Sequence, residues 1–132
     1  MRMSNRIEEA TNDADKYAGM VLHYSDNAEE YLRIGDYHKA SEMMLGAMSC
    51  VLKTVAAKRN KVINGHRALG KFAITLSKQE KNKEIFYSFA LASMLHQNFY
   101  ESNLDKFLVH SVCTDVAKTV GRLMKSMDYK AP

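Results

Sequence analysis

The scarcity of proline and glycine is the feature that most constrains the fold of this chain. Its 132 residues include one Pro and six Gly. A sandwich or barrel of several short strands needs repeated turn residues, whereas long stretches without Pro or Gly suit helices. A chain of this length can bury about two thirds of the surface that its unfolded form exposes, so its core needs no metal or disulfide. We therefore expect one all-α domain spanning residues 1–132.

Helical periodicity divides the chain into five segments in which apolar residues recur every three or four positions. Gly35 is predicted to end the first helix in the left-handed conformation, and Asp36 to cap the second. Asn64 and Gly65 mark the next break. Short connections of this kind predict an up-and-down bundle of four long helices plus one short helix, at about residues 4–34, 37–60, 66–78, 82–101 and 103–127.

Two of these segments carry further expectations about packing. The segment 82–101 is apolar almost all round, so we expect it to be the most buried helix, at the centre of the bundle. Ser102 and Asp105 resemble a capping box with Asp in place of Glu, and are predicted to open the last helix. Because two helices offer more apolar surface than one small bundle buries, we expect a homodimer.

Several classes of site are excluded by residue spacing. Cys50 and Cys113 form no Cys-x-x-Cys pair and no zinc-like spacing, so we expect buried, reduced thiols and no metal. No Glu is followed three residues later by His, as a di-iron bundle requires, and no Gly-rich phosphate loop or nucleophile elbow is present. We expect no cofactor. The absence of a long apolar run predicts no membrane segment and favours a cytoplasmic protein.

Charge is distributed unevenly along the chain. Residues 1–52 carry five Lys/Arg against nine Asp/Glu, residues 53–83 carry nine against one, and residues 84–132 carry five against five, which gives −4, +8 and 0. The basic middle block suits a phosphate-rich or acidic partner, or else forms a solvated corner that balances the acidic first helix. Its candidate ligand-binding residues include Lys58, Lys61 and Arg67.

The same block contains candidate catalytic residues at the second connection, namely Arg59, Asn60 and His66. In a metal-independent ribonuclease, a His moves a proton to or from a ribose hydroxyl while an Arg stabilises the charge on the phosphate. Asn60 would orient one of the two. The alternative is structural: Arg59 compensates the dipole at a helix C-terminus, and His66 caps or packs a helix N-terminus.

A second polar group ends the fourth predicted helix and consists of His96, Asn98, Tyr100 and Glu101. His96 lies within the most apolar helix, so part of its ring is expected to be buried and to need a hydrogen-bond partner. These residues form either a structural network or a ligand-contacting cluster at the end of the bundle.

Three segments resemble the archaeal PaREP family, a group within the HEPN-like helical domains: GDYHKASE at 35–42, GHRAL at 65–69 and LHQNFYE at 95–101. The similarity covers about residues 25–125. It implies a compact, commonly dimeric helical bundle of archaeal cytoplasmic origin. Many HEPN relatives cut RNA with an Arg followed, after four to six residues, by His, often with Asn or Asp directly after the Arg. Arg59, Asn60 and His66 fit that pattern, although the GHRAL segment also resembles a helix start in members without nuclease activity.

The expected function is therefore a dimeric HEPN-like module that binds nucleotides or RNA, or that mediates protein contacts. One alternative is a metal-independent endoribonuclease of the toxin or defence type, in which His66 is the general acid/base and Arg59 stabilises the phosphate. A toxin of that kind would have a nucleotidyltransferase antitoxin as its partner. The other alternative is a purely structural scaffold for protein interactions.

Overall fold

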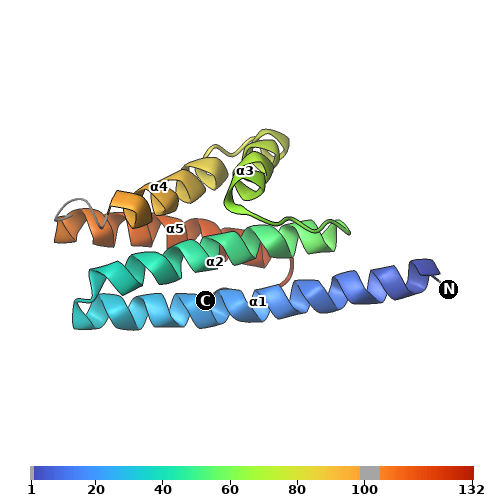
Figure 1. Ribbon diagram of the computed structural model, residues 1–132, viewed down its shortest axis with the longest axis horizontal. Coiled ribbons are helices and arrows are strands. Elements are labelled where there is room, and N and C mark those ends of the chain that lie inside the picture. The colour runs from blue at the N-terminus through green and yellow to red at the C-terminus, as the bar shows by residue number, and fades with distance from the viewer. Residues whose placement is uncertain (1, 99–104) are drawn as a thin grey trace.

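A computed structural model describes residues 2–98 and 105–132, with side chains from residues 13–97 and 105–132. Figure 1 shows that the described residues form an all-helical bundle, as the sequence predicts, without a strand. The predicted arrangement of four long helices plus one short helix fits this bundle. The helices are α1 (Arg2–Ile34), α2 (Tyr37–Lys58), α3 (His66–Glu80), α4 (Glu84–Asn98) and α5 (Lys106–Ser126).

Helices α1 and α2 form an antiparallel hairpin through a two-residue connection (Figure 1). Gly35 has a φ of 81°, which is the left-handed conformation predicted for it. Asp36 caps α2 as predicted, because its side chain accepts a hydrogen bond of 3.2 Å from the Lys39 backbone N–H. The N-terminal end of α1 extends beyond the end of α2 (Figure 1).

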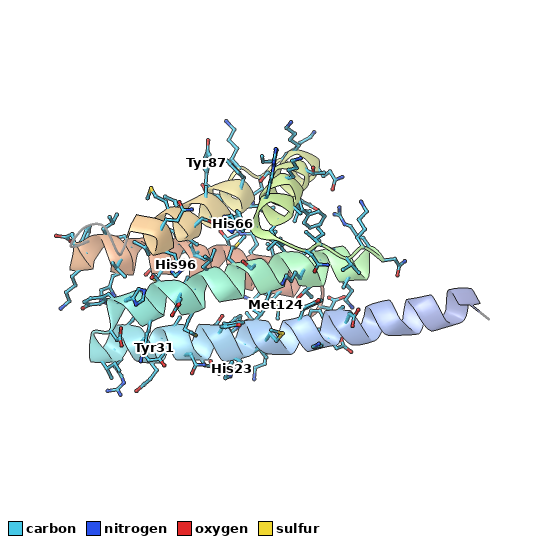
Figure 2. All side chains as sticks on the ribbon, in the orientation of Figure 1. His23, Tyr31, His66, Tyr87, His96 and Met124 are labelled. Carbon is cyan, nitrogen blue, oxygen red and sulfur yellow. The ribbon has the colours of Figure 1, made fainter. Side chains whose placement is uncertain are left out.

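The central helix is α2, not the 82–101 segment as predicted. It packs against the other four helices, whereas α4 contacts only α2, α3 and α5 within the described residues. Small residues along α2, such as Ala47 and Ala56, let neighbours approach it from several sides. The prediction fails because periodicity reports how much apolar surface a helix has but does not report how much of it finds a neighbour. In α4, Tyr87 and Met94 remain 49% and 41% exposed, and Tyr87 points away from the bundle (Figure 2).

Three helices are followed by a residue other than glycine in the left-handed conformation. Asn60, Lys81 and Asp128 have φ values of 60°, 52° and 64° after α2, α3 and α5. At the end of α2, the Lys61 N–H donates to the Ala56 carbonyl at 2.8 Å, which closes the last turn. Helix α2 therefore stops at Lys58, two residues before its predicted end.

Asp105, rather than Ser102, is the N-cap of α5. Its carboxylate accepts hydrogen bonds from the backbone N–H groups of Phe107 and Leu108, at 2.7 and 3.4 Å. Asp105 was predicted to act three residues inside the helix, so the helix begins later than the capping-box pattern indicates. Ser102 lies outside the described residues, as do residues 99–101 of the predicted fourth helix and residues 103–104 of the fifth.

Both cysteines are buried, as predicted, and are free thiols. Burial raises the pKa of the Cys113 thiol to about 11, and burial also raises the pKa of Cys50. Both groups are therefore protonated and poorly nucleophilic near neutral pH. Among the described residues, no group of three or more His, Cys, Asp or Glu side chains is placed to hold a metal ion. None of the described helices is long and apolar enough to cross a membrane.

Candidate functional site

Cationic side chains from two distant segments meet where α2 and α5 end. They line a pocket of about 440 Å³, which we call the basic pocket. Its cations are Lys58 and Arg59 from the end of α2 and Arg122 from the last turns of α5. The remaining lining residues come from the same two helices, from α3 and α4 with the connection between them, and from the residue after α5: Val55, Leu76, Glu80, Asn82, Ile85, Leu123, Ser126 and Met127.

Arg59 is held at the rim of the basic pocket by the end of α3. Its Nη1 donates a hydrogen bond of 2.6 Å to the Gln79 side-chain oxygen, and its Nη2 lies 3.9 Å from a Glu80 oxygen. The guanidinium also lies 6.0 Å from the centre of the Phe72 ring. These contacts fix the guanidinium where it borders the pocket, because three side chains of one helix hold it.

Lys58 is positioned by the C-terminal residues of the chain. Its ammonium lies 4.9 Å from the centre of the Tyr129 ring, a distance at which a cation is attracted to an aromatic face. Tyr129 directly follows the left-handed residue Asp128, and its N–H donates to the Met124 carbonyl at 2.9 Å. The turn after α5 therefore carries the ring to the end of α2.

The charge pattern of the sequence does not predict Arg122 as a site residue, because Arg122 lies in the electrically neutral last block. The signal that could have found it is the topology of the bundle. Helices α2 and α5 run in the same direction (Figure 1), so a cation one turn before the end of α5 comes close to the cations at the end of α2. Within the described residues, the Arg122 side chain makes no ion pair and no hydrogen bond.

His66 lies at the opposite end of α3 from Gln79 and Glu80, the two polar partners of Arg59. It is the first residue of α3, is exposed, and packs against the Phe89 ring of α4 with the ring centres 4.9 Å apart. Gln79, which binds Arg59, lies thirteen positions further along α3, a rise of about 20 Å. Phe72, which lies under the Arg59 guanidinium, is only six positions from His66. Among the described residues, the hydrogen bonds, ion pairs and ring contacts of Arg59 and His66 nevertheless have no partner in common.

The other predicted residues of the connection are all at the surface. Asn60 follows α2 and has the left-handed conformation that commonly ends a helix. Lys61 and Arg67 are exposed, and neither forms an ion pair with a described residue. These cations therefore extend the positive surface from the basic pocket toward the start of α3.

His96 lies far from this site, near the beginning of α2. Its half-buried ring stacks on His38, with the ring centres 6.2 Å apart and an angle of 7° between the planes. Arg59 follows His38 by 21 positions, so the two predicted groups are separated by about 30 Å along α2. The Asn98 side chain, Tyr100 and Glu101 lie outside the described residues.

Comparison with known proteins gives a match to one family model. No curated protein and no solved structure matches the chain. The model of the archaeal PaREP1/PaREP8 family matches residues 16–120, which include α2, α3 and α4 together with most of α1 and α5. Because that match covers most of its length, the chain belongs to the archaeal PaREP1/PaREP8 family.

Proposed function

We propose that this protein is a cytoplasmic HEPN-like module that forms a homodimer and binds nucleotides or RNA through its basic end. The observation that carries the proposal is the gathering of Lys58, Arg59 and Arg122 around one pocket. Positions 58 and 122 are far apart in the sequence, so the fold itself concentrates this charge. Phosphate groups are the ligands that such a concentration favours.

The lack of ion pairs at the neighbouring cations also supports a phosphate ligand. Lys58, Lys61 and Arg67 are exposed, and none forms an ion pair with a described carboxylate. Cations without a carboxylate neighbour remain available to phosphate, and neutralisation of phosphate by such side chains releases counterions from a nucleic acid. The affinity for RNA should therefore fall steeply as salt concentration rises.

A binding experiment tests this proposal directly. Fluorescence anisotropy of a labelled single-stranded RNA, titrated with the purified protein at several salt concentrations, should give an affinity that falls with salt. Replacing Lys58, Arg59 and Lys61 together by Gln should weaken binding and flatten that salt dependence. Circular dichroism checks that the triple variant stays folded. If the wild-type protein shows no RNA or nucleotide binding, the proposal fails and a scaffold for protein contacts becomes the better interpretation.

The arrangement of Arg59 and His66 supports binding rather than RNA cleavage. A ribonuclease of the expected type needs both side chains at one phosphate, but Arg59 is bound by Gln79 and His66 packs on Phe89. Incubation of structured RNA with the protein in EDTA separates the two functions. Intact RNA agrees with a binding module, whereas cleavage that His66→Ala abolishes would establish the endoribonuclease and point to an antitoxin partner.

The outer face of α4 supports the proposed homodimer. Tyr87, Ala90, Leu91 and Met94 line a shallow hollow of about 470 Å³ on that face, with Glu84 at one end. Tyr87 and Met94 lie equally far on either side of the Ala90–Leu91 pair. Two copies of α4 that cross antiparallel at this pair would therefore place Tyr87 of each copy against Met94 of the other. A second copy is the partner that this symmetric spacing fits.

A further inference from the structure

We propose that the basic pocket binds a terminal phosphate monoester carried on a nucleoside, and that Arg122 binds its phosphate. This inference rests on the proposed function and narrows its ligand from nucleic acid in general to one chemical group. Two sources can supply that group: a free nucleotide, or the phosphorylated end of an RNA strand.

The charge of the lining matches a monoester. Lys58, Arg59 and Arg122 contribute three positive charges, and Glu80 is the only carboxylate among the described lining residues, which leaves these residues a net charge of +2. A phosphate monoester carries about −1.5 to −2 near neutral pH, whereas an internal phosphodiester carries about −1. A terminal phosphate therefore neutralises the net charge of the pocket, whereas an internal phosphodiester leaves about one positive charge without a counter-charge.

Of the three cations, Arg122 has the most hydrogen-bond donors that no described residue uses. Arg59 already binds Gln79, and Lys58 already lies over the Tyr129 ring. Arg122 makes no hydrogen bond or ion pair with any described residue, so the N–H groups of its guanidinium remain open to a ligand. A guanidinium binds two oxygens of one phosphate with parallel hydrogen bonds. Because Arg59 and Lys58 are positioned before the ligand arrives, binding costs less conformational entropy.

The other lining residues suit a nucleoside. Leu76, Ile85 and Leu123 are at least nine-tenths buried and give the pocket an apolar floor. The Asn82 side-chain oxygen accepts from the Glu84 N–H at 3.0 Å, which leaves the amide NH₂ of Asn82 as a donor. A base offers an apolar face for such a floor and polar atoms at its edge. The volume of about 440 Å³ lies within the range of small-ligand sites.

The experiment uses the full chain and defined probes. Isothermal titration calorimetry should show that AMP binds at least about 10-fold more tightly than adenosine alone or inorganic phosphate alone. The same short RNA is then compared with a 5′-phosphate, a 3′-phosphate or no terminal phosphate. A terminal phosphate that strengthens RNA binding about 10-fold or more over the unphosphorylated RNA identifies the RNA end as the source. If AMP binds and the terminal phosphate gives no such gain, the source is the free nucleotide.

Two variants separate the pocket from general electrostatics. Arg122→Gln should weaken AMP binding about 10-fold or more. Lys106→Gln removes one charge from the other end of α5, outside the lining, and should leave AMP binding within about 2-fold of the wild type. Equal losses in the two variants would overturn the inference.

The RNA measurements keep this inference distinct from the proposed function. If AMP does not bind and terminal phosphates leave RNA affinity unchanged, the pocket inference is wrong, but salt-dependent RNA binding would still support the proposed function. If neither AMP nor any of the RNAs binds, both proposals fail.

Discussion

The Tyr129 hydroxyl donates a hydrogen bond of 2.5 Å to Asp15 Oδ1, and so links the residues after α5 to the first helix. Lys58 of α2 lies over the same ring at 4.9 Å. Burial, the hydrogen bond to Asp15 and the negative charge of Asp15 together raise the pKa of Tyr129 to about 12. One side chain therefore contacts two helices and holds a cation at the edge of the basic pocket.

Replacing Tyr129 by Phe should make stability less dependent on pH at the alkaline end. The pKa of Tyr129 in the folded protein lies above its unfolded value of about 10, so its contribution is complete below pH 10 and is lost as pH rises through about 12. Urea unfolding should therefore show Tyr129→Phe to be less stable by about 0.5 to 1 kcal/mol below pH 10. The two proteins should converge by about pH 12.

Tyr129→Phe removes only the hydroxyl and keeps the aromatic ring that faces Lys58, so it tests the hydrogen bond separately from the ring contact. A stability difference that stays constant between pH 10 and 12 would show that the phenol contributes through packing and not through its hydrogen bond. RNA affinity should change little in Tyr129→Phe, whereas Tyr129→Leu, which removes the aromatic face, should weaken it.

Two glycines in neighbouring helices should respond in opposite directions to replacement by Ala. A Cβ at Gly46 would lie 2.9 Å from Cδ1 of the Tyr24 ring, so α2 can approach α1 here only because the side chain is absent. A Cβ at Gly19 would meet nothing within 4 Å. Overpacking typically costs about 1 to 3 kcal/mol, and Ala gains about 1 kcal/mol over Gly in a helix.

The expected results follow from those two quantities. Gly46→Ala should lower the free energy of unfolding by about 1 kcal/mol, and Gly19→Ala should raise it by about 0.5 to 1 kcal/mol, both measured by urea denaturation. Stabilisation by both substitutions would mean that the Tyr24 ring moves aside at little cost.

Local signals predicted most of the fold correctly. Gly35 and Asp36 were assigned their roles from residue type alone, because only a few residues suit a left-handed stop or an N-cap. The position of α4 could not be predicted in this way. Its apolar residues report total hydrophobicity, but whether Tyr87 meets a neighbour depends on how α3 crosses the bundle, and no local pattern encodes that.

The candidate site was predicted only in part, for a similar reason. Lys58 and Arg59 were identified because they belong to a basic run, whereas Arg122 comes from a segment without net charge and joins them only through the fold. Conversely, Arg59 and His66 are close in sequence, but the connection and α3 carry them to different contacts. Proximity along the chain is therefore a poor guide to shared chemistry in a helical bundle.

The left-handed conformation of Asn60 gives a test of whether this residue is structural or orients a reacting group. Asn60→Gly should leave the free energy of unfolding unchanged or slightly raised, because Gly adopts a φ of 60° without strain. Asn60→Ala should lower it by about 1 kcal/mol. RNA binding should be retained in both variants. A loss of RNA binding in Asn60→Gly with unchanged stability would instead assign the Asn60 amide a direct role at the ligand.

The exposed face of α4 predicts the oligomeric state. Sedimentation or light scattering should give the wild-type protein twice the 15.0 kDa mass of one chain. Met94→Glu should shift it to a monomer, because two-fold symmetry would bury the introduced charge twice in an apolar contact. Ile74→Glu is the matched control: Ile74 on α3 is 39% exposed against 41% for Met94, but lies outside the α4 hollow. A monomeric wild type, or dissociation of both variants, would contradict an interface at α4.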